Sequence, residues 1–250
     1  MCTLTIIPTE SGYLAGMNRD ELRTRSLALP NLSISNRDLS FVAPREPSGG
    51  TWIGCNERGD LLALLNWNPP SRQEKPTILT SRGTIIPRLF EFADHSSLEN
   101  VTTKLALESY APFRLVGVSL EARAIQEVRW DGTSLDKLTF PWSRGHWFSS
   151  SASDEHAARS RGAACELAAQ HWPAGKSWLR RLHRSHNPSA GAYSVCVHRP
   201  DAATVSYTEV LLDPKQATMR YLAGHPCQKE AFDSQVTLPI STVRPFAMAS

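Results

Sequence analysis

The residues with the clearest capacity for chemistry lie in the first 21 positions, in "MCTLTIIP" and in "NRDE" (Asn18–Glu21). Removal of Met1 would make Cys2 the N-terminal residue, with a thiol and a free α-amine on one residue. Unperturbed α-amines have a pKa of about 7.7–8.0 and thiols of about 8.5. Such an amine is substantially neutral near pH 7 and can act as the general base for the thiol. The alternative is that Cys2 is a small hydrophobic residue at the head of an edge strand.

The neighbours that a nucleophilic cysteine needs are also present in the sequence. If residues 2–7 and 12–18 pair as an antiparallel hairpin, the "NRDE" segment lies next to Cys2. Arg19 could then lower the pKa of the thiol, and Asp20 could orient the amine. The alternative is that Arg19 and Asp20 form a salt bridge in a turn, which contributes little to stability. The residues alone leave both interpretations open.

Other cysteine and histidine residues give weaker signals. "CVH" (Cys196–His198) and "GHPC" (Gly224–Cys227) each offer a soft ligand and an imidazole, but neither has a matching second half nearby, so no metal site is expected. His183 and His186 lie among arginines and are expected at the surface of a helix. The chain contains no phosphate-binding glycine motif and no G-x-S-x-G motif.

The composition excludes several classes of protein. Of 250 residues, 41% are hydrophobic and 20% charged, which is typical of globular proteins, and the net charge of +3 does not indicate a nucleic-acid binder. There is no membrane-spanning run of roughly 18 apolar residues and no pattern of a signal peptide. The five cysteines are never spaced C-x-x-C, which favours a reducing compartment. We therefore expect a cytoplasmic protein with no membrane span and no nucleic-acid partner.

The pattern of apolar and turn residues predicts strands, helices, strands, helices and strands in that order. A loop is expected over residues 26–48, and a helix is expected to begin at Ser96, with Glu99 completing a capping box. This order favours an α+β fold in which hairpin-built antiparallel sheets are covered by separate groups of helices, as one domain over residues 1–250. The expected strands are 2–7, 12–18, the hairpins 51–67 and 113–132, then 192–199, 203–213 and 217–224; the expected helices lie within 80–110, 153–172 and 177–185.

Several of these segments together resemble one family. "MCTLTIIP", "LAGMNRDELRTR", "GGTWIGCNERGDLLALLNW" and "SRG" are similar to blocks of the NRDE family, also called the transport-and-Golgi-organisation family. "APFRLVG", "HWFSSS", "SVCVHRPDAATVSYTEV" and "YLAGHPC" look like its downstream blocks, so the resemblance covers most of the chain. The family is similar to N-terminal-nucleophile hydrolases. The resemblance thus implies a four-layer αββα sandwich of two antiparallel sheets covered by helices.

The resemblance also implies roles for particular residues. Cys2 would be the nucleophile, Arg19 and Asp20 its activators, and Asn66, at the end of "LALLN", an oxyanion donor. Three further residues are candidates for oxyanion or substrate contacts: Asn18, Ser150 and Arg199. Ser150 stands where the hydrolases carry a second asparagine, and loss of an oxyanion donor typically costs about 10²–10³ in rate.

Two functions are compatible with these residues. The first is hydrolysis of a small acyl amide or thioester through Cys2, with no cofactor. The second is non-catalytic binding or trafficking of haem or an acyl lipid in the same pocket, in line with the family's association with haem trafficking and lipid homeostasis. Under it the candidate haem ligands are Cys2, His198, His225 and Cys227. A fold with no activity at Cys2 is the third reading.

Overall fold

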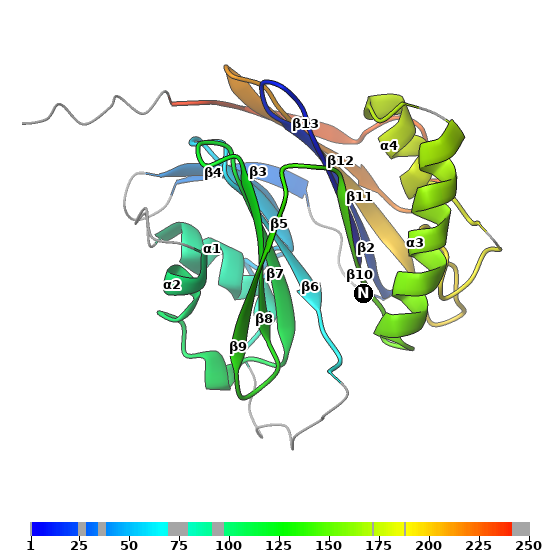
Figure 1. Ribbon diagram of the computed structural model, residues 1–250, viewed down its shortest axis with the longest axis horizontal. Helices are drawn as coiled ribbons and strands as arrows, with labels where there is room; N and C mark the ends of the chain where they lie inside the picture. Colours follow the sequence, from blue (N-terminus) through cyan, green and yellow to red (C-terminus); the bar gives the residue numbers. More distant parts are fainter. Residues whose placement is uncertain are drawn as a thin grey trace, which may run out of the picture.

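The computed structural model describes residues 2–24, 29–34, 39–69, 80–91, 98–171, 173–187 and 189–241. In this part of the chain two antiparallel sheets face each other, and helices cover the outer face of each sheet (Figure 1). One sheet lies under α3 (Asp154–His171) and α4 (Lys176–His183), the other under α1 (Ile85–Glu91) and α2 (Leu98–Thr102). The predicted α+β class and four-layer αββα sandwich are confirmed.

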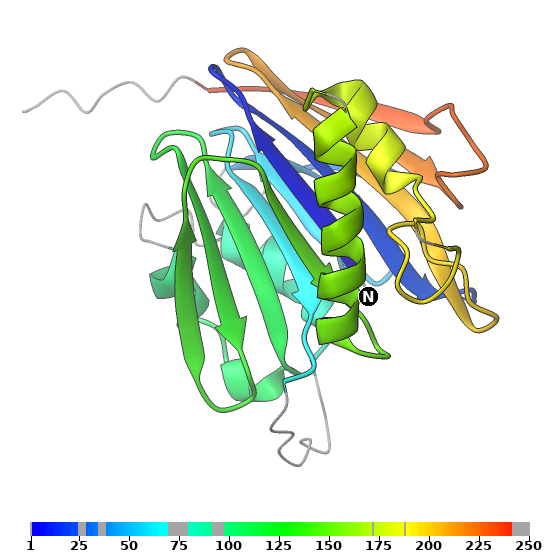
Figure 2. The same cartoon turned by 45° about the vertical axis from the view of Figure 1, so that its right-hand side comes forward.

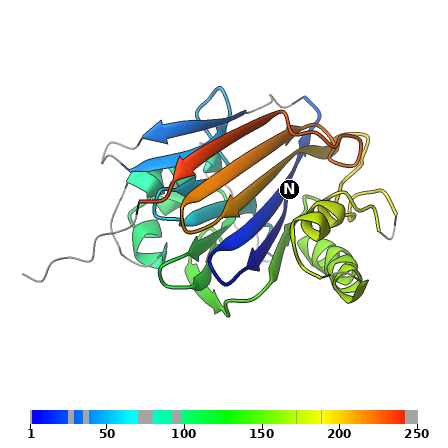
Figure 3. The same cartoon turned by 90° about the horizontal axis from the view of Figure 1, so that it is seen from above.

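The first sheet has six strands, and it carries the N-terminal strand in its interior. Their order is β10-β1-β2-β11-β12-β13, so β1 pairs with β2 on one side and with β10 on the other. Figure 3 shows β2 in blue beside the orange and red strands from the C-terminal part of the chain. The bounds are β1 (Cys2–Pro8), β2 (Tyr13–Leu22), β10 (Gly145–Ser149), β11 (Ala202–Leu212), β12 (Gln216–Ala223) and β13 (Ser234–Pro239).

The second sheet has seven strands in the order of the chain, each paired with the next. Its central hairpin, β5–β6, turns through Gly59, whose φ of 80° is accessible to glycine at little cost. The Asn56 side-chain oxygen accepts hydrogen bonds from the backbone of Arg58 and Asp60 and closes this turn. The bounds are β3 (Leu29–Ile34), β4 (Ser40–Arg45), β5 (Ile53–Asn56), β6 (Leu61–Asn66), β7 (Phe113–Ser119), β8 (Ala124–Trp130) and β9 (Leu135–Phe140).

Successive side chains of each strand point to opposite sides of the sheet, and this separates the core into layers. Leu4, Ile6 and Met17 point between the two sheets, where they pack with Ile53 and other apolar residues of the second sheet. The opposite face of the first sheet packs under α3 and α4, which lie across it in Figure 2. The side chains that flank the N-terminus are therefore divided between an inner and an outer face.

Two predicted segments differ from the structure. The expected loop over residues 26–48 contains β3 and β4, in which Pro30 and Pro44 lie opposite each other. Proline is tolerated there because β3 is an edge strand and β4 pairs with β5 only through Phe41 and Val42. The expected strand over residues 192–199 consists of turns and bends, with only His198 bridging to the next strand, at Ala203.

Besides β3 and β4, three strands were not predicted: β9, β10 and β13. The edge strands β9 and β13 are largely exposed, so they lack the apolar alternation that reveals a half-buried strand.

In the 80–110 region the structure has α1 and α2 as two short helices, with 3-10 turns η1 (Arg82–Thr84) and η2 (Leu107–Ser109). The predicted cap Ser96 lies outside the described residues. No helix in the described ranges combines the length and apolar character that crossing a membrane requires.

Candidate active site

The register of β1 fixes the surroundings of Cys2. Cys2 lies opposite Arg19 on β2 and opposite Ser149 on β10, so the predicted pairing of the first two strands is confirmed. The Cys2 backbone N–H donates a hydrogen bond of 2.9 Å to Ser149 Oγ. Cys2 is 6% exposed, so a ligand can contact its thiol only at the bottom of a pocket.

Such an opening exists between the ends of the two sheets. It is a pocket of about 270 Å³ lined by Cys2 and Arg19 from the first sheet, and by Trp52 and Asn66 from the second. A fifth wall residue is Arg82, from η1. The pocket therefore brings the candidate nucleophile together with one amide and two guanidinium groups from four separate segments.

The four residues of the "NRDE" segment are divided by the alternation of β2. Arg19 and Glu21 line the pocket, with Arg19 Nη2 3.9 Å from Glu21 Oε2. Asn18 points to the outer face, where its Nδ2 donates hydrogen bonds of 2.9 Å to the carbonyls of His183 and Val195. Although Asp20 also borders the pocket, its carboxylate accepts a hydrogen bond of 2.6 Å from Thr204 Oγ1. Asn18 is thus bound to the outer layer and not directed at a ligand.

Arg19 is held rigidly beside Cys2. It forms an ion pair with Glu46, and its guanidinium carbon lies 4.2 Å from the centre of the Trp52 ring. The sequence-based alternative of an Arg19–Asp20 salt bridge is wrong, because the ion pairs of Arg19 in the described structure are with Glu21 and Glu46. Burial raises the pKa of the Cys2 thiol, Asp20 raises it further, and Arg19 lowers it. The net shift is upward, so the thiol is protonated near pH 7.

Arg161 lies on the outer face of the first sheet next to Cys2 and Asp20, and the sequence analysis did not predict it. It is fully buried on α3, where its Nη1 donates to Thr3 Oγ1 at 2.8 Å and to the Cys2 carbonyl at 3.2 Å, and its Nη2 lies 3.4 Å from Asp20 Oδ2. Burial raises the pKa of Asp20, and Arg161 opposes that shift. A signal was available: Arg161 interrupts the buried stripe formed by Ala157, Ala164 and Cys165.

Arg82 is the second missed residue, in the "SRG" segment quoted for the family resemblance. The next residue, Gly83, packs closely against the segment that leads into β5: a Cβ on Gly83 would lie 3.1 Å from the Gly50 Cα, and Thr51 N–H donates to the Gly83 carbonyl. Arg82 Nη1 donates a hydrogen bond of 2.8 Å to the Pro112 carbonyl. Burial lowers the pKa of Arg82, whereas Cys2 and Glu21 raise it. The guanidinium therefore interacts electrostatically with the thiol.

The remaining candidates are divided between the pocket and the outer layer. Asn66 lines the pocket. Ser150 is buried beside α3, where its N–H donates to Asp154 Oδ1 at 2.5 Å, and it is the preceding Ser149 that contacts Cys2. Arg199 forms an ion pair with Asp201 and donates to Ser151 Oγ. Neither Ser150 nor Arg199 is among the residues that line the pocket.

Two expectations for histidines and cysteines need correction. His183, expected at the surface, is fully buried, and its Nε2 lies 3.1 Å from Thr5 Oγ1. The segments around Cys196–His198 and Gly224–Cys227, expected to have no partners, meet each other, because His198 Nε2 lies 3.3 Å from Cys227 Sγ. Each segment thus lies next to a second cysteine and histidine pair, which the sequence alone did not reveal.

Fold and site together define an αββα sandwich with a cysteine at the head of an interior strand, facing a charged pocket. The chain belongs to the Transport and Golgi organisation 2 (TANGO2) family, whose model matches residues 1–189. Among the curated proteins there is no match.

Two solved structures are similar to this chain in part. One is penicillin V acylase from Agrobacterium tumefaciens, with 11% identity over 89% of this chain and 83% of that chain, at a TM-score of 0.47. The other is a mutant of conjugated bile acid hydrolase from Clostridium perfringens, with 13% identity over 97% of each chain, at a TM-score of 0.44. Likeness at this level defines neither the activity nor the substrate of this chain.

Proposed function

We propose that this protein is an N-terminal-nucleophile amidohydrolase that cleaves a small acyl amide or thioester through Cys2. The observation that carries the proposal is the position of Cys2 at the head of β1, where its thiol lines the pocket and its nitrogen is bound by Ser149 Oγ at 2.9 Å. Removal of whatever precedes Cys2 would convert that nitrogen into a free amine 2.9 Å from the same hydroxyl.

The amine is the base that the site needs. Because burial raises the pKa of the Cys2 thiol, a proton acceptor must be near it for the thiolate to form at neutral pH. Asp20 Oδ2 is buried and is paired with Arg161 Nη2 at 3.4 Å, but it accepts no hydrogen bond within the described residues, so a freed amine could donate to it. The buried Arg161 guanidinium next to this end of β1 opposes a second positive charge, which favours the neutral amine.

The chemistry then follows in two steps. Cys2 Sγ attacks the carbonyl carbon and forms a C–S bond, and the bond from that carbon to the leaving nitrogen or sulfur breaks. The thiol proton passes to the amine and from it to the leaving amine or thiol. Water then attacks the resulting thioester, breaks its C–S bond, and releases the carboxylic acid and the Cys2 thiol. The Asn66 amide and the Arg82 guanidinium line the same pocket and can donate hydrogen bonds to the oxyanion formed in each step.

The pocket also favours one kind of substrate. Ligand pockets are commonly about 300–1,000 Å³ and mostly apolar. This one has about 270 Å³ and is bordered by Arg19, Arg82, Glu21 and Glu46. It fits a small substrate with polar groups better than it fits haem or a long acyl chain.

The proposal is tested by mass spectrometry after incubation with an acyl p-nitrophenyl ester. We expect the purified chain to begin at Cys2 and to gain one acyl group on that residue. The Cys2→Ala variant should lose the label, and the control Cys165→Ala, which removes a buried cysteine of α3, should keep it. Efficient acylation of a chain that retains Met1, or equal labelling of Cys2→Ala, would contradict the proposal.

A further inference from the structure

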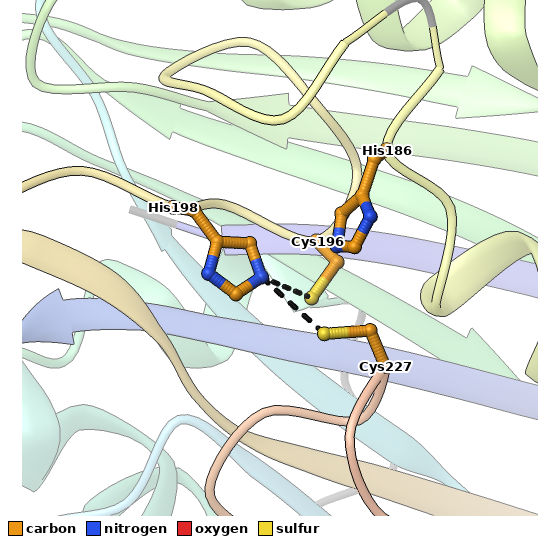
Figure 4. Close-up of side chains that lie close together, drawn as sticks. All are labelled: His186, Cys196, His198 and Cys227. Atoms are coloured by element: carbon orange, nitrogen blue, oxygen red, sulfur yellow. Dashed lines mark hydrogen bonds between the residues drawn. The ribbon is translucent and has the colours of Figure 1, made fainter.

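Four potential metal ligands from two loops meet at one end of the first sheet: three from the α4–β11 loop and one from the β12–β13 loop. His186 follows α4, Cys196 and His198 precede β11, and Cys227 lies between β12 and β13. Their ligand atoms all lie within 4.8 Å of one another (Figure 4). Cys196, His198 and Cys227 lie beyond residue 189, where the family match ends. We propose that these residues form a four-coordinate binding site for Zn²⁺ or a chemically similar soft divalent cation.

The distances are close to those of a tetrahedral site. Zn–S bonds of about 2.3 Å and Zn–N bonds of about 2.0–2.1 Å give ligand-to-ligand distances of roughly 3.4–3.8 Å in a tetrahedron. His198 Nε2 lies 3.3 Å from Cys227 Sγ and 3.7 Å from Cys196 Sγ, so two ligand pairs already have close to this spacing. The most distant pair needs to approach by about 1 Å, which a change of rotamer in a loop residue can supply.

The ligand atoms are also available. Both cysteines are free thiols. His186 Nε2 is buried and has no hydrogen-bond partner in the described structure, a costly state for a polar atom. The His186 and His198 rings lie 4.9 Å apart, edge to face, and face the two sulfurs in Figure 4. A bound cation would satisfy the unpartnered nitrogen.

Hydrogen bonds to backbone carbonyls hold the two loops in place. Cys196 N–H donates to the Ser185 carbonyl at 2.9 Å and so brings the two ends of the α4–β11 loop together, next to His186. Arg184 donates to the carbonyls of Pro226 and Lys229, at 2.7 and 2.6 Å, on either side of Cys227. The site is therefore built in advance, which reduces the entropy lost on binding.

The ligand set points to zinc chemistry and to a structural role. Two thiolates and two imidazoles in a tetrahedron are typical of Zn²⁺, and four protein ligands leave no open position for a substrate. Binding would form two Zn–S bonds and release the two thiol protons to solvent. The site would also support Asp20, since Thr204 Oγ1 accepts a hydrogen bond from Val197 N–H and donates one to Asp20 Oδ1.

The test uses the full chain, purified with a phosphine reductant and freed of metal by a chelator. Titration with Zn²⁺ should show one equivalent bound. Cys196→Ser and Cys227→Ser should each weaken the affinity at least about tenfold, whereas the control Cys165→Ala should bind as the parent does. Failure of the parent chain to bind Zn²⁺ at micromolar concentration would overturn the proposal, and so would unchanged affinity in both serine variants.

A second measurement applies if the serine variants do not fold. The parent chain loaded with Co²⁺ should show the d–d bands of a tetrahedral centre and thiolate-to-metal charge-transfer bands. Octahedral spectra without charge transfer would overturn the proposal. So would a Cys196–Cys227 disulfide that survives the reductant and excludes the metal, because those two thiols would then form a redox pair and not a cation site.

Discussion

The two faces of β1 and β2 show how adjacent residues serve different purposes. On the inner face, Cys2 and Arg19 border a pocket between the sheets. On the outer face, Asn18 is buried and donates to the His183 carbonyl, and the Asp20 carboxylate, although it also borders the pocket, accepts a hydrogen bond from the Thr204 hydroxyl. A contiguous tetrapeptide is therefore not one functional unit: its alternate residues work in separate layers of the sandwich.

This comparison separates two kinds of effect. Substitutions on the outer face should mainly change the free energy of unfolding, because the groups there are buried and bonded to one another. Substitutions on the inner face should mainly change the reactivity of Cys2, because the groups there face an open pocket.

The largest expected effect is at Arg161. Arg161→Ala leaves the buried Asp20 carboxylate without its charged partner, and removal of one member of a buried ion pair typically costs about 3–5 kcal/mol of unfolding free energy. Urea denaturation measures the loss. The control is Arg159→Ala on the same helix, whose exposed ion pair with Glu155 should contribute less than about 0.5 kcal/mol. Equal stability of the two variants would show that the outer face does not depend on this pair.

The two asparagines give the most direct contrast between the faces. Asn18→Ala leaves two buried carbonyls without their donor and should cost about 1–3 kcal/mol of unfolding free energy. Asn66→Ala should change stability by less than about 0.5 kcal/mol but slow the acylation of Cys2 by about 10²–10³. Urea denaturation and the rate of ester-dependent acylation measure the two effects. A reversed pattern would contradict the division into faces.

Acidification should weaken the outer face. Burial lowers the pKa of His183 to about 3, from 6.5 in the unfolded chain. Between these values the unfolded state binds a proton that the folded state does not, so stability is full above pH 6.5 and falls as the pH decreases. At pH 5 this one histidine should cost about 2 kcal/mol. Urea denaturation at pH 7 and pH 5 measures the loss, and His183→Gln should show a smaller difference between the two.

The smallest expected effect is on the inner face, at Arg82. Arg82→Gln removes a cation that interacts with the thiol, so the pKa of Cys2 should rise and its alkylation by iodoacetamide should slow by about tenfold at pH 7.5. Stability should change by less than about 1 kcal/mol. The internal control is Cys55, whose thiol has a pKa raised to about 12 by burial and should react slowly in both proteins. An unchanged rate at Cys2 would remove Arg82 from the site.

The sequence predicted those parts of the fold that depend on neighbouring residues. The β1–β2 and β5–β6 hairpins have short connections, so their apolar patterns and turn residues were sufficient to place Arg19 next to Cys2. Because successive side chains of a strand alternate between its two faces, the sequence of β2 alone could also have predicted that Asp20 points away from Arg19.

Other parts of the site depend on contacts that local patterns do not encode. Ser149, and not Ser150, faces Cys2, and a register that differs by one residue reverses every side chain. Arg161 reaches Cys2 only because α3 crosses the first sheet. The meeting of His198 with Cys227 requires two loops 29 positions apart to converge. Each of these follows from tertiary packing, which one sequence without homologues does not reveal.

The interior position of β1 has a consequence for the timing of maturation. Ser149 lies 147 positions after Cys2, so at about 5–20 residues per second the ribosome needs roughly 7–30 s to supply the strand that completes the pairing of β1. During that interval β1 lacks its second neighbouring strand, so the peptide bond that precedes Cys2 is accessible to a processing peptidase. Afterwards the Cys2 nitrogen is buried beside Ser149. Under the proposed function, a molecule would become active only if the bond before Cys2 is cleaved before β10 is synthesised and pairs with β1.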